Sequence, residues 1–232
     1  MNIKRFLLLL FILSFVSSYA SEKVFFNLNT DISSSYVFRG LKPADRSASA
    51  SIHFSAFFSE TNLNFSQWYV NSLKHPSLYH ESGTMLTYHH YFSDEHIGST
   101  GMTLYLLPGV DQTPLANTEL SFSFANIGFI IPYFIESYYD FVLNSLYLKL
   151  SAGYTFDTIL PLNLSLSAGL NCLEYSRFGQ TVPVGISDMI LSLYTYISLK
   201  NWQISPNLSL FFLNTSNTSI LAQAKINLGY SF

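Results

Sequence analysis

The residues that could carry chemistry are few, because only 11% of the 232 residues are charged. Segments that alternate polar and apolar residues hold eight titratable side chains on their polar sides: Asp31, Arg39, His53, Glu119, Glu136, Lys149, Asp188 and Lys225. Both signs of charge, set among Ser, Asn and Gly, could hydrate and sort solutes in a water-filled passage. They could equally pair with one another and merely satisfy a closed interior. Both alternatives stay open from the sequence.

Arg39 is the most informative of these side chains. It directly precedes Gly40 and shares parity with Asp31, so we expect it to face an aqueous interior near the rim and not lipid. Asp31 lies some eight residues away, about 26 Å along a strand, so a carboxylate on another strand such as Glu119 is the better partner. Arg39 could bind anionic or polar solutes or could clamp the structure, and of the two roles we favour the clamp.

Enzymatic chemistry finds little support in the sequence. A hydrolase would need a Ser or Asp beside a His, and His89, His90 and His96 lie in or beside one segment without a Ser at a recognisable motif. The single Cys172 excludes an internal disulfide and is expected on an apolar strand face. We predict no enzyme, no metal and no other cofactor. The formal net charge of −3, without a basic run, predicts no nucleic-acid partner.

The N-terminus predicts export. Lys4 and Arg5 precede an apolar run over residues 6–16, and Ser18-Tyr19-Ala20 is a small-x-small cleavage site. We predict a signal peptide over residues 1–20, cleaved after Ala20, and a mature domain over residues 21–232. The alternative of a retained membrane helix is disfavoured because the run is too short and lacks a charged far flank.

The clearest element is the last one, residues 219–232. Even positions are apolar from Ile220 to Phe232, and odd positions include Gln223, Lys225 and Asn227, a period of two that predicts a β-strand. Its end, Tyr230 and Phe232, resembles the C-terminal assembly signal of a bacterial outer-membrane β-barrel. A strand closing a soluble sandwich is the alternative.

The same period predicts about twelve strands of roughly ten residues. They are expected near residues 24–39, 48–58, 62–69, 84–92, 101–106, 119–124, 129–135, 145–154, 162–171, 189–199, 202–212 and 219–232. Pro132 and Pro206 should force bulges or early ends. Residues 137–141 are expected to form an aromatic loop, and residues 173–185 a long one.

The connections between these strands alternate in length. Long ones follow strands one, three, five, seven and nine, and short ones follow two, six, eight and ten, as in outer-membrane barrels with both termini in the periplasm. Aromatic residues make up 17% of the chain, and a barrel can turn them toward lipid and use Tyr and Trp as interfacial girdles. The sequence thus predicts an all-β transmembrane antiparallel up-and-down barrel in the outer membrane of a Gram-negative bacterium.

One stretch resembles a known family. Ser34-Ser35-Tyr36-Val37-Phe38-Arg39-Gly40 is similar to the S-x-Y-x-F-R-G signature of a family of small outer-membrane porins, the TorF-type family. Tyr105-Leu106-Leu107-Pro108-Gly109 with Thr118-Glu119, and Tyr138-Tyr139-Asp140, resemble further segments of that family.

The resemblance implies a porin-like channel for passive diffusion of small hydrophilic solutes. Its partners would be outer-membrane lipids, the barrel-assembly machinery and small polar solutes, with no oligomeric state defined. A non-conducting structural or adhesive barrel is the alternative, and an outer-membrane hydrolase a weaker one. This chain has Ser and Asn where the family usually carries more charge, so its ion selectivity stays open.

Overall fold

The computed structural model of the protein describes residues 24–39, 41, 48–74, 80–106, 116–177, 180–214 and 219–232. The predicted signal peptide and its cleavage site lie outside these residues. The strands are β1 (Val24–Ser33), β2 (Ser49–Phe58), β3 (Leu63–Ser72), β4 (His80–Tyr91), β5 (His96–Leu106), β6 (Ala116–Asn126), β7 (Tyr133–Asp140), β8 (Ser145–Phe156), β9 (Leu162–Asn171), β10 (Tyr175–Arg177), β11 (Gln180–Val182), β12 (Gly185–Thr195), β13 (Ile197–Leu199), β14 (Trp202–Leu213) and β15 (Ser219–Ser231). Within the described ranges, no helix is long and apolar enough to cross a membrane.

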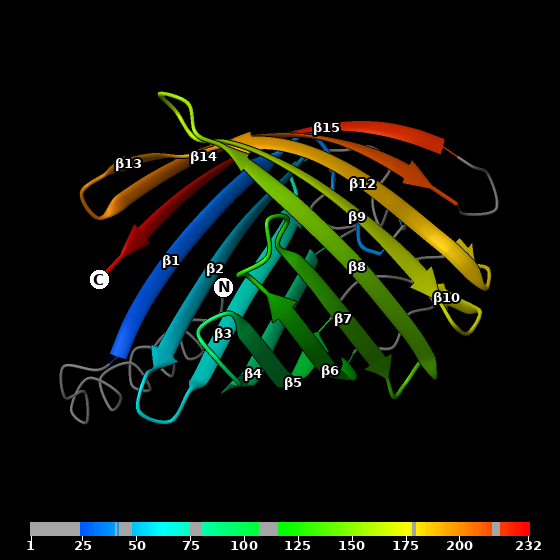
Figure 1. The fold of residues 1–232 in the computed structure, drawn as a ribbon. Coiled ribbons are helices and arrows are strands. Elements are labelled where there is room, and N and C mark those ends of the chain that lie inside the picture. The colour runs from blue at the N-terminus through cyan, green and yellow to red at the C-terminus, as the bar shows by residue number, and fades with distance from the viewer. Residues whose placement is uncertain are drawn as a thin grey trace, which may run out of the picture.

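The strands close into one antiparallel barrel. From β1 to β9 each strand pairs with the next one along the chain. β9 then pairs with β12, β12 and β13 both pair with β14, β14 pairs with β15, and β15 returns to pair with β1. Figure 1 shows the tilted strands wrapping around a common axis, with red β15 beside blue β1. The short β10–β11 hairpin forms a separate sheet at one end.

Pro206 divides one barrel strand into β12 and β13. β12 ends by pairing Tyr194 with Asn207, and β13 resumes with Ile197 opposite Ile204, so both pieces keep one register across the gap. Pro206 falls in this gap and has no N–H to donate, whereas its other side stays paired opposite Ile226 of β15. The ladder is interrupted, and the bulge expected here does not form. With β12 and β13 counted as one, the barrel has twelve strands, as predicted.

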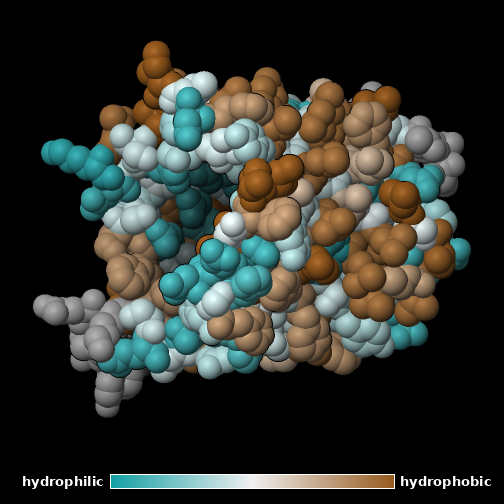
Figure 2. Space-filling model, viewed as in Figure 1, coloured by the Kyte–Doolittle hydropathy of each residue, from teal (hydrophilic) through white to brown (hydrophobic). Residues whose placement is uncertain are grey.

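Alternation sorts side chains between lipid and interior as predicted. Leu166 and Leu193 point outward and are 50% and 40% exposed. Ser192 Oγ lies inside, 2.7 Å from Ser209 Oγ across the β12–β14 ladder. The outer wall in Figure 2 is accordingly mostly brown, the colour of hydrophobic residues.

One end of the barrel, which we call the terminal end, carries both Val24 and Phe232. The seam between the first and last strands is completed there by a hydrogen bond of 3.0 Å from Phe232 N to Phe26 O. Aromatic rings gather around this end, with ring centroids 4.6 Å apart for Trp202 and Tyr230 and again for Tyr230 and Phe232. This arrangement is that of an interfacial aromatic girdle.

Another predicted boundary, that of the aromatic loop, is wrong. β7 begins at Tyr133, directly after Pro132, and runs to Asp140, so most of the expected aromatic loop is strand. Proline is tolerated before the first strand residue because its missing N–H is not needed there. The expected loop over residues 173–185 contains the β10–β11 hairpin.

The predicted first strand also ends early, at Ser33 and not near Arg39. Ser33 Oγ donates to Ser35 O at 2.6 Å, and Ser34 Oγ accepts from Ala224 N at 3.0 Å. These side-chain bonds replace the regular ladder and let the backbone leave the wall. We call residues 34–39 together with Leu41 the first-loop segment.

Candidate functional site: the lumen and its inward segment

The barrel encloses a cavity of about 680 Å³. Seven of the eight predicted site residues line it, namely Asp31, Arg39, His53, Glu119, Lys149, Asp188 and Lys225. The eighth, Glu136, adjoins it by pairing with Lys149. Figure 2 shows a hollow with teal, hydrophilic residues around and inside it, at the end of the barrel where Figure 1 places the C-terminus. The structure therefore brings all eight side chains to the interior, and their role as pore lining stays a prediction.

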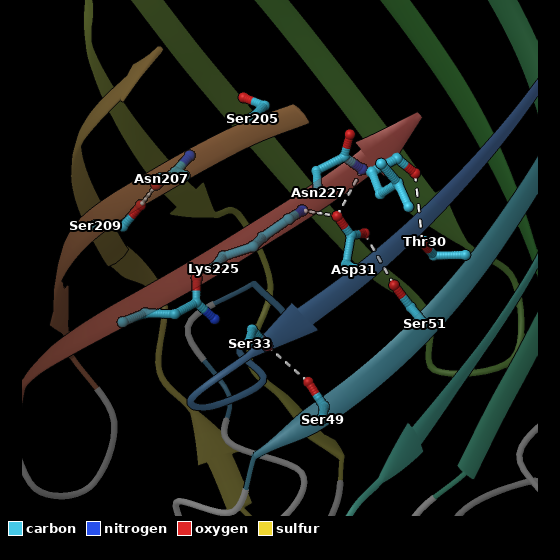
Figure 3. Close-up of polar contacts among 12 residues, drawn as sticks. Thr30, Asp31, Ser33, Ser49, Ser51, Ser205, Asn207, Ser209, Lys225 and Asn227 are labelled. Atoms are coloured by element: carbon cyan, nitrogen blue, oxygen red, sulfur yellow. Dashed lines mark hydrogen bonds and ion pairs between the residues drawn. The ribbon is translucent and has the colours of Figure 1, made fainter. Parts of the chain in front are cut away.

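Asp31 lies at the centre of a polar cluster on the β15–β1–β2 wall (Figure 3). Its Oδ1 accepts a hydrogen bond from Asn227 Nδ2 at 2.8 Å and lies 3.1 Å from Lys225 Nζ, and its Oδ2 accepts one from Ser51 Oγ at 2.9 Å. The register explains the set, because Asn227 and Ser51 are directly opposite Asp31 on the two neighbouring strands. The carboxylate is thus held on the wall by three partners.

A second ion pair crosses from β7 to β8. Lys149 Nζ lies 2.9 Å from Glu136 Oε2, and the two residues are directly opposite in the ladder. Tyr138, on the same face of β7, donates its hydroxyl to Glu136 Oε1 at 2.5 Å. Both charged side chains are partly exposed to the lumen.

Arg39 lies in a cage of aromatic rings and a carboxylate. Its guanidinium carbon is 4.9 Å from the ring centroid of Phe38, 4.3 Å from that of Tyr138 and 5.2 Å from that of Tyr147. Its Nη1 pairs with Oε2 of Glu119, whose side chain is only 1% exposed. We call these four partners the Arg39 cage. Glu119 is the partner favoured from the sequence, and Arg39 itself is 13% exposed.

The cage is tied to further carboxylates through tyrosine hydroxyls. Tyr105 donates to Glu119 Oε1 at 3.4 Å, and Tyr147 donates to the two oxygens of Asp188 at 3.2 and 3.3 Å. Gly169 makes room for the Tyr147–Asp188 contact, since a Cβ there would lie 2.3 Å from the Tyr147 hydroxyl oxygen. Tyr105 thus holds the Glu119 carboxylate of the cage, and Asp188 holds its Tyr147 ring.

Two contacts fix the first-loop segment inside the barrel, one at each end. Ser34 N donates to Ala224 O of β15 at 2.8 Å, while Phe38 and Leu41 exchange backbone hydrogen bonds of 2.9 and 2.8 Å that close a turn within the segment. Leu41 is fully buried against Val182 and Leu143 at the barrel end opposite the terminal end. Because Tyr36, Val37, Phe38 and Arg39 line the cavity, the segment narrows the lumen from within.

The backbone at Arg39 is left-handed, with φ of 46°. This conformation costs a non-glycine residue about 1–2 kcal/mol, and Asn and Gly tolerate it best. The cage contacts of the guanidinium are of a size to offset that cost, since a desolvated cation–π contact contributes up to about 2 kcal/mol. The inward position of Arg39 thus comes from this turn and from the cage, and not from strand parity as the sequence suggested.

Sequence reasoning missed Phe38 and Tyr138 as site residues, because it assigned one to the lipid face and the other to a loop. It also left out the buried carboxylates Glu81 and Asp140. Tyr105 and Tyr147 occupy polar-face positions of their alternating segments, and both line the cavity. Their positions were the sequence signal that aromatic rings enter the lumen.

A Ser–His–Asn arrangement lies at the terminal end. Ser93 Oγ is 2.9 Å from His96 Nδ1, and Asn126 Nδ2 is 3.2 Å from His96 Nε2. Asn126 Oδ1 accepts a hydrogen bond of 3.1 Å from Phe129 N, so its NH₂ group faces the imidazole and donates to Nε2. Ser93 Oγ also accepts hydrogen bonds from the backbone N–H groups of Glu95 at 3.2 Å and His96 at 3.1 Å, so its side chain closes the turn between β4 and β5. This group therefore fits a structural turn better than a catalytic triad.

The sequence matches no family model and no curated protein. Solved structures do match. The KdgM porin superposes with a TM-score of 0.60 at 12% identity, over 89% of this chain and 99% of its own. The NanC porin gives 0.54 at 8% identity over 89% and 98% of the two chains. An outer-membrane channel from Pseudomonas putida F1 gives 0.52 at 12% over 90% and 95%. The chain has the fold of outer-membrane porins, a closed twelve-stranded antiparallel β-barrel, and this fold supports the predicted outer-membrane location.

Proposed function

We propose that the chain is an outer-membrane channel for passive diffusion of small hydrophilic solutes, with a lumen narrowed by the first-loop segment. The observation that carries the proposal is the cavity of about 680 Å³, whose lining combines charged and polar side chains with aromatic and aliphatic ones. About eight strands enclose an interior that side chains can fill, whereas twelve enclose a wider one. A wide interior with a polar lining is suited to water and solutes.

The interior charges favour neutral or cationic solutes. In the described part of the chain, three carboxylates line the cavity, Asp31, Glu119 and Asp188, against the three cations Arg39, Lys149 and Lys225. Glu81, Glu136 and Asp140 lie beside or behind this lining and add negative charge to the interior. A KdgM porin has been solved in complex with oligogalacturonate, which is a polyanion. The excess of negative charge around the lumen would repel such a solute.

Membership of the TorF-type family belongs to this proposal. Its support is the stretch from Ser34 to Gly40, whose Arg39 lies in the lumen. Lipids and the barrel-assembly machinery are the partners that such a fold requires, and Phe232 would carry the assembly signal.

A non-conducting barrel is the second candidate. The ion pairs Asp31–Lys225 and Glu136–Lys149, together with the inward segment, favour it because they satisfy the interior internally. The comparison structures are porins and channels, and Ser93, beside His96, closes a turn by accepting two backbone hydrogen bonds, which suits a structural role.

Conductance of the refolded protein in a planar bilayer tests the proposal. We expect discrete openings, and a reversal potential in a KCl gradient that reports preference for K⁺ over Cl⁻. Heat-modifiable mobility on a gel establishes beforehand that the barrel is folded. A folded barrel that stays silent would refute the channel and leave the structural candidate.

A further inference from the structure

We infer that the Arg39 cage is a binding site for the guanidinium group of a cationic solute, and that the chain's own Arg39 occupies it in this structure. The inference deepens the proposed function and rests on it, because solutes must enter the lumen to reach the cage. It names guanidinium-bearing organic cations as a solute class that the channel recognises.

The composition of the cage matches a guanidinium ion. Tyr138 and Tyr147 place ring faces 4.3 and 5.2 Å from the guanidinium carbon, which suits a planar, delocalised cation. Glu119 supplies a charge-assisted hydrogen bond from a nearly dry position, being 1% exposed. Rings and a buried carboxylate together form a site in which a guanidinium exchanges its water shell for matched partners.

The remaining acids strengthen this preference. Glu136 and Asp188 accept hydrogen bonds from the Tyr138 and Tyr147 hydroxyls, so a carboxylate stands behind each ring, and the one behind Tyr138 is also paired with Lys149. A hydroxyl that donates to a carboxylate makes its ring more electron-rich, which strengthens attraction of a cation to the ring face. An anionic solute would meet Glu119 and these two carboxylates instead and would be disfavoured.

The occupant is tethered. Arg39 lies within the turn between Phe38 and Leu41 and has a left-handed backbone. Leu41, at the end of this turn, is anchored by its contacts with Val182 and Leu143. A tethered group competes with a free solute at an effective concentration in the millimolar range. Removing the Arg39 side chain should therefore expose the site, while the wild-type protein should bind the same solute more weakly.

Lys225 provides a matched control. It is also a lumen cation paired with a carboxylate, Asp31, at 3.1 Å. In the described residues, it is Arg39 that lies over aromatic rings. Deleting the Lys225 side chain therefore frees a carboxylate without freeing an aromatic cage.

The test is calorimetric titration of methylguanidinium into refolded, detergent-solubilised protein. Arg39→Ala should bind methylguanidinium at least about tenfold more tightly than the wild type, because the tethered competitor is gone. Adding Glu119→Gln to Arg39→Ala should weaken that binding by about tenfold, through loss of a charge-assisted hydrogen bond. Lys225→Ala should bind no better than the wild type.

Absence of binding by folded Arg39→Ala would overturn the inference, as would equal binding by Lys225→Ala. If Arg39→Ala does not fold, Arg39→Gln is titrated in its place, since its shorter neutral side chain also leaves the cage without a cation. Calorimetry needs no conducting pore. A silent barrel that binds methylguanidinium would thus refute the channel and keep the site, and a conducting barrel that does not bind it would do the reverse.

Discussion

The pair Arg39–Glu119 should hold the first-loop segment inside the barrel, and a double-mutant cycle of Arg39→Gln and Glu119→Gln measures how strongly. Glu119 is 1% exposed and Arg39 13%, so neither charge is well hydrated if its partner is removed. A hydrogen bond between charged groups contributes about 1.5–3 kcal/mol. We therefore expect each single change to weaken docking of the segment and the two to couple by about 2 kcal/mol. About 2 kcal/mol corresponds to a change of roughly 30-fold in the ratio of docked to undocked segment.

Trp68 reports on this docking from inside the lumen. Its ring lies 5.5 Å from that of Tyr105, which in turn lies 6.0 Å from that of Phe38 in the first-loop segment. The chain has two tryptophans, and the other, Trp202, is on the outer wall at the terminal end. In a Trp202→Phe background, Trp68 fluorescence and its quenching by acrylamide, at urea concentrations below barrel unfolding, give the docked fraction of each variant.

The control for this cycle is Lys225→Gln combined with Glu119→Gln. Lys225 pairs with Asp31 and not with Glu119, so its loss should add to that of Glu119 without coupling. If Arg39→Gln and Glu119→Gln also add without coupling, as the control pair should, the ion pair does not hold the segment and the reasoning is refuted.

Three further changes test the wall of the barrel. Leu166→Lys should lower the free energy of unfolding by about 2–4 kcal/mol because Leu166 faces lipid in the middle of β9, whereas Ser165→Lys on the inner face should lower it much less. Urea unfolding in lipid vesicles compares the two variants, and equal losses would mean that the register is wrong. Gly169→Ala should lower the free energy of unfolding by about 1–3 kcal/mol, since the new Cβ would lie 2.3 Å from the Tyr147 hydroxyl oxygen. Gly153→Ala, whose new Cβ would have its nearest atom at 3.4 Å, should lower it less in the same urea unfolding experiment. Deleting Phe232 should lower the amount of heat-modifiable barrel in the outer-membrane fraction, and unchanged amounts would show that Phe232 is not the assembly signal.

Strand pattern and side-chain orientation could be read from the sequence because lipid leaves little choice. A charged residue on the outer face is costly, so parity alone placed Asp31, Glu136, Lys149 and Asp188 inside. The ladder then brings Glu136 opposite Lys149 without any further signal. Cross-strand registers depend on connections whose lengths were known only approximately, so these pairs could not be assigned beforehand.

Proline positions show where pattern reading fails. Pro132 and Pro206 both interrupt alternating segments, and the sequence assigned the same effect to each. In the fold, Pro132 precedes β7, whereas Pro206 lies within β14 and leaves a gap opposite the β12–β13 break. The difference depends on whether the missing N–H faces a partner strand, which is a property of the sheet and not of the local sequence.

The first-loop segment shows why the site itself needed the structure. Parity carries information only while a ladder continues, and the ladder of β1 stops at Ser33. Beyond it Phe38, predicted to face lipid, and Arg39, predicted to face inward, both line the same cavity. The turn places the Arg39 guanidinium and the neighbouring Phe38 ring in the lumen, where the opposite wall offers rings and a carboxylate to hold them. Tyr138, Tyr147 and Glu119 come from β7, β8 and β6, three strands far from residue 39 in sequence. The Arg39 cage is therefore a product of barrel closure, and this dependence makes the segment sensitive to a solute that competes for the same partners.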